Sequence, residues 1–307
     1  MLHPKFLIVT LLAVQLISLT NIASGQGCSD AGFCTINNFK PDNIDTASSV
    51  TSNQVRLGLS YGSADHSITV AGEYLEYNRK INDQWGIDAK LTALSQSGNG
   101  ISVFGLSDIF LNASFSANKK LKLIAGLKIP LTDGNKMKDN LPLPMDYQSS
   151  LGTFDLIAGV SCEVQKLQFI IALQQPLTQN ENKFMAEIYP ASSELREFQS
   201  TNLFQRSGDV LLRASYLINA GEKFKITPSL LPIYHLMNDK FTDITNSEKE
   251  ITGSQGLTLN GNLYFDYQLT GTATLQLNAG APFIVRDARP DGLTRHFVMN
   301  LEYRIKF

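Results

Sequence analysis

The chain has 307 residues, of which 43% are hydrophobic and 18% charged, and its formal net charge is −2. A chain without a basic stripe has little to neutralise phosphates with, so no nucleic-acid partner is expected. The mean hydropathy of −0.06 fits an exported soluble protein or a transmembrane β-barrel. A barrel belongs in this range because the residues that face its lumen dilute the apolar signal.

The N-terminus predicts a signal peptide at residues 1–25. Lys5 is followed by an apolar run over residues 6–19, and the small residues Ala23 and Gly25 then mark a cleavage site. At about 14 residues, the run is shorter than the roughly 20 residues that a membrane-spanning helix needs. We therefore expect cleavage after Gly25 and export of the remaining chain.

Residues 26–52 form a polar segment without useful periodicity, which fits either a periplasmic extension or a plug folded into a barrel. Cys28 and Cys34 enclose five residues of this segment. An exported chain meets oxidising conditions, so a local disulfide is predicted. A thiolate metal site and a lipidated Cys28 are the alternatives. The next histidine is His66, which leaves a metal site short of ligands.

From residue 53 onward, apolar and polar residues alternate in one segment after another. Side chains of a strand point alternately to its two faces, so each segment predicts a strand with one apolar and one polar face. The predicted strands are residues 53–62, 67–78, 84–94, 106–116, 120–130, 152–164, 167–176, 208–218, 223–236, 256–268, 272–283 and 296–307.

Short turns alternate with longer connections between these strands, and only the connection 63–66 breaks the order. An outer-membrane barrel has tight periplasmic turns and long extracellular loops. We therefore predict an all-β fold over residues 53–307, a transmembrane, antiparallel, up-and-down barrel of about 12 strands with both termini in the periplasm. The longer connections are residues 95–105, 131–151, 177–207, 238–255 and 284–295.

The final predicted strand ends on an aromatic residue, and alternate residues back from Phe307 are apolar, among them Ile305 and Tyr303. This strand resembles the last strand of bacterial outer-membrane barrels. The resemblance implies that these three residues belong to a sorting signal read by the barrel assembly machinery, and that outer-membrane lipid surrounds the protein. Aromatic residues near other strand ends, such as Tyr61 and Tyr74, are expected at the lipid interface.

Three motifs in the middle of the chain carry a more specific resemblance. They are Gly105-Leu-Ser-Asp108, Gly126-Leu-Lys-Ile-Pro130 and Gln148-Ser-Ser-Leu-Gly-Thr-Phe-Asp155. Their order resembles the outer-membrane proteins associated with phenol meta-cleavage pathways, a transporter family distantly similar to hydrocarbon and fatty-acid channel barrels. The chain departs from that family at Ser107, where glycine is usual. The resemblance implies passive uptake of small molecules. Hydrophobic or aromatic solutes are candidates, but the family's substrate specificity does not carry over to this chain.

Charged residues of both signs are expected to point into the lumen. We predict that most of them pair across the lumen, where a lone charge would be costly to desolvate. For some of them we predict a polar constriction that tunes the passage of a small-molecule solute. The predicted lumen residues are Arg56, Glu73, Asp88, Lys90, Lys122, Lys128, Asp155, Arg213, Asp266, Glu302 and Arg304.

Motifs for catalysis are missing from the sequence. Neither His235 nor His296 stands beside a nucleophile-elbow serine, and no His/Glu metal motif or phosphate loop occurs. No enzyme activity, cofactor or metal is therefore expected. Two functions remain, an outer-membrane channel or transporter, and a closed structural or adhesive barrel whose extracellular loops bind a partner. A cavity lined by apolar side chains would favour hydrophobic uptake.

Overall fold

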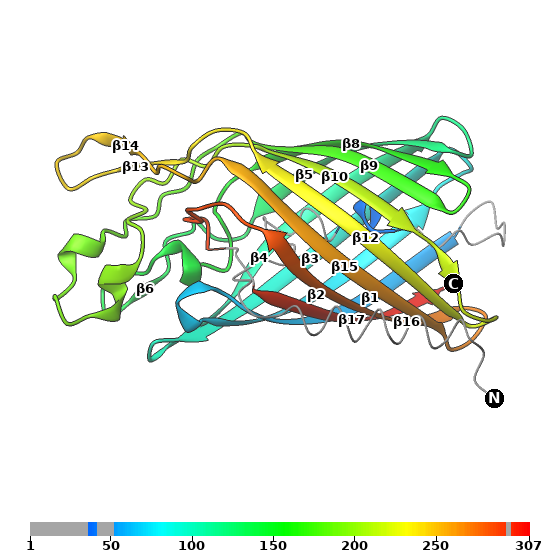
Figure 1. Cartoon of the computed structure of the whole chain (residues 1–307), viewed down its shortest axis with the longest axis horizontal. Helices are drawn as coiled ribbons and strands as arrows, with labels where there is room; N and C mark the ends of the chain where they lie inside the picture. The colour runs from blue at the N-terminus through cyan, green and yellow to red at the C-terminus, as the bar shows by residue number, and fades with distance from the viewer. Residues whose placement is uncertain (1–35, 42–51, 293–295) are drawn as a thin grey trace.

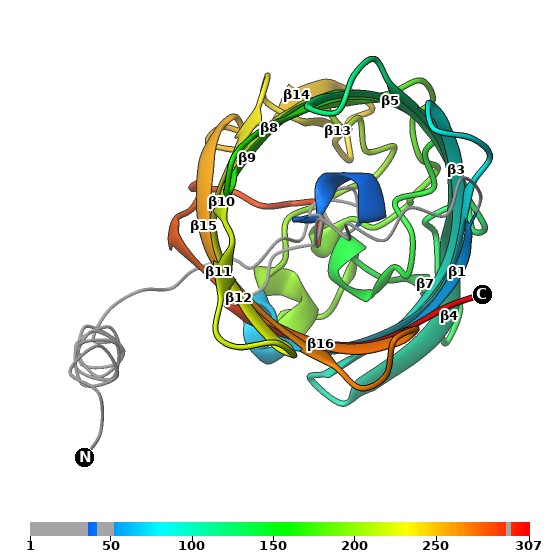
Figure 2. The ribbon, with the colours of Figure 1, turned by 90° about the vertical axis from the view of Figure 1, so that its right-hand side faces the viewer.

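The computed structural model describes residues 36–41, 52–292 and 296–307. Within these residues, 12 long strands close into one antiparallel barrel, seen from the side in Figure 1 and end-on in Figure 2. This result confirms the predicted fold. The wall strands are β1 (Ser52–Ser63), β2 (Thr69–Lys80), β3 (Trp85–Gly98), β4 (Ile101–Ser116), β5 (Leu121–Pro130), β8 (Asp155–Val164), β9 (Leu167–Pro176), β10 (Asp209–Tyr216), β12 (Phe224–His235), β15 (Gly256–Gln268), β16 (Ala273–Ile284) and β17 (Phe297–Lys306).

The barrel closes where its first strand meets its last one. β1 pairs with β17 from Gln54 to Ser63, and the backbones of Asn53 and Phe307 exchange two hydrogen bonds of 3.0 Å. On the far side, β10 pairs with both β9 and β12, and the short β11 (Ile218–Asn219) also lies beside β12. Each described wall strand therefore has two partners, as lipid requires, because no water is present there to satisfy an open edge.

The wall is apolar outside and polar inside. Leu57, Leu59 and Leu301 are exposed on its outer face, whereas Arg56 and Glu302, on the same strands, are buried inside. This distribution suits a wall surrounded by lipid, where the outward residues form an apolar band. Within the described ranges, no helix has both the length and the hydropathy to cross a membrane.

The long connection predicted at residues 95–105 is wrong, because β3 and β4 continue into one long hairpin. Its turn is Asn99-Gly100, with φ angles of 52° and 68°. Asn-Gly is a favoured pair for a type I′ turn, whose backbone twist matches the twist of the flanking strands. The run of small and polar residues 95–100 obscures the alternation there, although the Asn-Gly pair itself is a hairpin signal.

The remaining long loops of the described chain gather at one end of the barrel, which we call the long-loop end. The Asn99-Gly100 turn and the connection 64–68 also lie at this end, whereas the other short turns and Phe307 lie at the opposite end, the short-turn end (Figure 1). The loops carry short elements, namely β6 (Met137–Lys138), β7 (Leu141–Pro142), η4 (Met145–Tyr147), η5 (Ala186–Ile188), η6 (Glu194–Glu197), β13 (Lys240–Thr242) and β14 (Glu248–Glu250).

Two of these loops, residues 131–154 and 177–208, fold back over the long-loop end and form a cap. Tyr147 and Phe198 of the cap are buried in one apolar cluster with Ile68 and Val70 of the wall region. The ring of Phe198 also stacks on that of His66, with centroids 4.1 Å apart. Burying each large side chain contributes about 1.5–3 kcal/mol, so the cap is a packed part of the fold.

Replacing Phe307 by aspartate should impair assembly in cells far more than stability. An acidic residue on the lipid face near the interface costs at most about 1 kcal/mol, whereas loss of a sorting aromatic would prevent recognition. Heat-modifiable mobility of the membrane fraction measures assembly, and refolding of the purified chain into detergent measures stability, with Phe307→Tyr as the control. Normal membrane levels of Phe307→Asp would contradict the predicted assembly signal.

Candidate functional site: the lumen and its plug

Residues 36–41, here called the plug segment, lie inside the barrel (Figure 2). The segment contains the single turn η2 (Asn37–Phe39), closed by a 3.0 Å hydrogen bond from the Phe39 amide to the Ile36 carbonyl. Of the two placements considered for the N-terminal segment, these residues follow the plug. Cys28 and Cys34 lie outside the described residues, so their disulfide stays a prediction.

The plug segment makes charged and polar contacts with one side of the lumen. The Lys40 ammonium donates to Glu302 Oε2 at 2.6 Å and to the Tyr74 hydroxyl at 3.1 Å, and it lies 5.2 Å from the centroid of the Tyr74 ring. The Tyr74 hydroxyl itself donates to Glu302. The Asn38 amide donates to Asp88. Both Asn38 and Lys40 of the plug therefore contact a buried carboxylate on this side.

Around these contacts, buried charges of β1, β2, β3, β15 and β17 form what we call the polar wall. Glu302 pairs with Arg304 and with Arg56, the latter at 3.4 Å, and Arg304 reaches Asp266 at 3.4 Å. The buried charged residues of the polar wall are Arg56, Glu76, Asp88, Lys90, Asp266, Glu302 and Arg304. With Lys40 the set has four positive and four negative groups, so the plug completes its charge balance.

The opposite side of the lumen, which we call the apolar wall, has different chemistry. Its inward residues pack against Ile36 and Phe39 of the plug in one buried cluster. Gly159 of β8 makes room for this contact, because a Cβ there would lie 2.5 Å from Phe39 Cε1. The lumen is therefore two-sided, and the plug segment touches both sides. The apolar wall consists of Phe110, Ile124, Ile157, Ile170, Ala172, Leu211, Leu231 and Ile233.

Most of the predicted lumen residues point inward. Lys128 pairs with Asp155 at 2.9 Å, and the Arg213 guanidinium lies 5.9 Å from the centroid of the Tyr264 ring. Lys122 lines a hollow of about 320 Å³ at the short-turn end, beside Asn38 of the plug. Pairing thus occupies many of these charges, and their role as a constriction stays a prediction. Those buried in the lumen are Arg56, Asp88, Lys90, Lys128, Asp155, Arg213, Asp266, Glu302 and Arg304.

The prediction for Glu73 is wrong, and so is that for its neighbour Tyr74. Glu73 is exposed and lines a groove of about 530 Å³ on the outer face together with Leu59 and Leu75. Tyr74 points inward to Glu302. The alternation of apolar and polar residues in β2 was misleading, because the cap covers the inner face of β2 near the long-loop end. Val70 points inward there and is nevertheless apolar.

Four functional side chains escaped the sequence analysis. Asn38, Phe39 and Lys40 lie in a segment without periodicity, and only their contacts reveal them. Glu76 is a fully buried residue of the polar wall, and the error in the phase of β2 hid it. Its alternation with Leu75 and Tyr77, both exposed, is the signal that could have found it.

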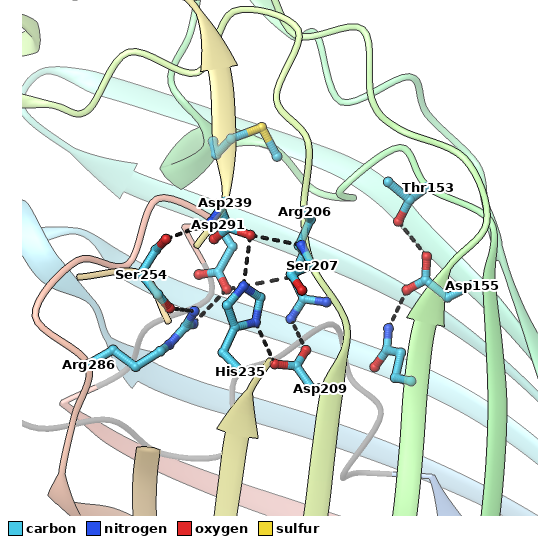
Figure 3. A network of polar contacts seen from close by, with 12 residues as sticks. Thr153, Asp155, Arg206, Ser207, Asp209, His235, Asp239, Ser254, Arg286 and Asp291 are labelled. Atoms are coloured by element: carbon cyan, nitrogen blue, oxygen red, sulfur yellow. Dashed lines mark hydrogen bonds and ion pairs between the residues drawn. The ribbon is translucent and has the colours of Figure 1, made fainter. Parts of the chain in front are cut away.

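A second polar network fastens the loops to the barrel at the long-loop end (Figure 3). His235, the last residue of β12, contacts Asp209 of β10 at 2.7 Å through Nδ1 and Asp239 at 2.8 Å through Nε2. Because carboxylates accept hydrogen bonds, both ring nitrogens must carry a hydrogen here. The amide of Asp239 donates in turn to Ser254 Oγ at 2.7 Å, and Ser207 donates its amide to Asp239 at 2.9 Å.

Two arginines extend this network to the last long loop. Arg206 pairs with Asp209, and Arg286 pairs with Asp291 at 2.9 Å and donates to the Ser254 carbonyl at 2.9 Å. Burial alone would raise the pKa of Asp291, but Arg286 and Arg206 hold that pKa below its ordinary value. Three loops distant in sequence thus share one buried ionic cluster.

No protein-family model matches the chain, and no curated protein sequence matches it. Among solved structures, an outer-membrane channel from Pseudomonas putida is similar over 87% of this chain and 100% of that one, with 12% identity and a TM-score of 0.54. The NanC porin matches over 82% of this chain and 98% of that one, with 9% identity and a TM-score of 0.44. The KdgM porin covers 82% and 99%, with 6% identity and a TM-score of 0.41. The first likeness shows that the chain has the fold of an outer-membrane barrel.

Proposed function

We propose that the protein is a bacterial outer-membrane channel for the passive uptake of small molecules. The observation that carries this proposal is a closed barrel whose lumen is occupied by a separate segment, residues 36–41, held through side-chain contacts. A segment held in this way can be withdrawn without breaking the strand pairing of the wall. In this proposal the long-loop end is extracellular, and both termini lie in the periplasm.

The lining of the lumen favours solutes with an apolar part. A uniformly charged lumen would suit small ions, whereas the apolar wall offers a continuous surface of Ile, Leu and Phe side chains. Ligand sites commonly combine such a surface with a few polar groups that orient the ligand. Uptake of hydrophobic or aromatic molecules is therefore part of the proposal.

A second function, that of a closed adhesive or structural barrel with binding loops, has one observation in its favour. The cap and the buried cluster around His235 close the long-loop end with packed and paired side chains. The hairpin β13–β14 extends beyond that cluster (Figure 1). Conductance distinguishes the two functions, because a permanently closed barrel passes no current even without its plug.

Deletion of residues 26–51 should raise the conductance of the purified barrel in planar bilayers. The deletion removes Phe39 and Lys40 from the lumen but no residue of any wall strand, because β1 begins at Ser52. Heat-modifiable mobility verifies folding. A folded deletion variant with no current for any ion or solute would reject the channel and favour the adhesive barrel.

Substitution of Gly159 by alanine should raise the conductance in the same direction but less. The added Cβ clashes with the Phe39 ring, so the plug segment must shift away from the apolar wall. The same substitution in the chain that lacks residues 26–51 is the matched control and should change little. An equal effect in both backgrounds would place the cause in the wall.

Asp291→Asn should loosen the long-loop end while leaving the barrel folded. Removal of one partner from a buried ion pair costs about 3–5 kcal/mol, and here Arg286 would lose its carboxylate. Limited proteolysis within residues 236–255 measures the effect as faster cleavage. Asp287→Asn, an exposed carboxylate on the same loop, is the control. Equal cleavage rates in both variants would show that the cluster does not hold the loops.

A further inference from the structure

The plug segment presents the lumen with two adjacent side chains of opposite chemistry. Phe39 packs against the apolar wall. The next residue, Lys40, places its ammonium against Glu302 and over the Tyr74 ring. About ten bonds separate the Phe39 ring from the Lys40 nitrogen, so the pair has the outline of an amphiphilic amine with a long spacer. The wall thus shows, through its own plug, which chemistry it can bind.

The polar wall without Lys40 has an excess of negative charge. Its buried cations are Arg56, Lys90 and Arg304, against the four carboxylates of Glu76, Asp88, Asp266 and Glu302. Glu76 Oε2 has no hydrogen-bond partner among the described residues, and Glu76 is one of the two carboxylates that attract Lys40. A buried carboxylate is costly without a cation, so a ligand that replaces the plug should carry a positive charge.

The recognition groups for that charge are those that an ammonium prefers. The Lys40 ammonium lies 2.6 Å from a carboxylate oxygen of Glu302, 3.1 Å from the Tyr74 hydroxyl and 5.2 Å from the centroid of the Tyr74 ring. A carboxylate together with a tyrosine ring is a typical environment for an organic cation. An anionic ligand in the same position would face Glu302 and Glu76, and a neutral one would leave the polar wall with three cations against four carboxylates.

The apolar wall sets the second requirement. Removing Phe39 and Ile36 would expose Phe110, Leu211 and Leu231 to lumen water, and these side chains are at most 1% exposed with the plug in place. A ligand covers this surface only if it has an apolar body. A simple ammonium ion lacks that body.

We propose that the lumen binds amphiphilic amines, with the apolar body at the position of Phe39 and the ammonium at that of Lys40. The plug segment is then an internal stand-in for the ligand, and the two compete for the same two walls. This inference rests on the proposed function, because a solute must reach the lumen for its binding to matter in uptake.

Chemical rescue of the plug tests this assignment. The full mature chain with Phe39→Ala and Lys40→Ala retains the barrel but loses the ring and the ammonium. Isothermal titration calorimetry with 9-phenylnonylamine, whose spacer matches this separation, should show binding at least about tenfold tighter than with ethylamine, 9-phenylnonanol or 9-phenylnonanoate, because each comparison removes one of the two recognition elements or reverses the charge. The same amine should bind the unmodified chain more weakly, since the plug competes with it.

In the chain with Phe39→Ala and Lys40→Ala, the further substitution Glu302→Gln should weaken amine binding about tenfold. This is the effect of one lost charge-assisted hydrogen bond. Glu73→Gln makes the same chemical change on the outer face and should leave binding unaltered. If Glu302→Gln does not fold, Tyr74→Phe removes the neighbouring hydroxyl while keeping the ring, and it should weaken binding in the same direction. Equal binding of all four probes, tighter binding of 9-phenylnonanoate, or binding insensitive to these lumen variants would overturn the proposal.

Current recordings on the same protein separate this proposal from the channel itself. A barrel that passes no ions yet binds the amine selectively in the calorimeter would reject the channel and retain the binding site. A conducting barrel without selective amine binding would retain the channel and reject the site.

Discussion

The structure depends on one constraint, which is that every backbone polar group of a strand in lipid must be satisfied by another strand. The pairing of β1 with β17 meets this constraint by closing the sheet. Closure then decides where side chains go, because alternate residues of every strand must point inward. The polar inner faces are thereby concentrated in a narrow space, and their charges have to be compensated there.

Compensation comes partly from the wall and partly from the plug segment. Within the wall, Lys128 with Asp155 and Arg304 with Asp266 join strands that are neighbours or nearly so. Lys40 with Glu302 instead joins residues 262 positions apart in sequence. The two faces of the last strand, β17, therefore have different surroundings. Tyr303 is exposed on the outer face, whereas Glu302 binds the plug on the inner face.

The sequence predicts the barrel well because two of its regularities are local. Apolar and polar residues alternate within each strand, and most strands pair with the next strand along the chain. It predicts the lumen charges for the same reason wherever one strand face is uniformly apolar. β2 defeats this reasoning, since Val70 and Tyr74 share the inner face with Glu76. There the covering residues come from loops more than 60 positions away, such as Tyr147 and Phe198. The plug is harder still, because a single turn has no period, and only the three-dimensional match of Phe39 with Gly159 reveals its position.

The ionic cluster at the long-loop end limits how the loops can vary. Asp239 and Ser254 hold the base of one loop, and their partners Arg286 and Ser207 belong to two others. Grafting any one of these loops onto a related barrel would leave buried charges without partners in the host. The three loops can therefore be exchanged only together. The hairpin between Lys240 and Glu250 lies beyond these anchors and is held by its own pair, Lys240 with Glu248 at 2.7 Å. Sequence can change or be inserted at its tip without disturbing the barrel, so this hairpin can carry a foreign peptide.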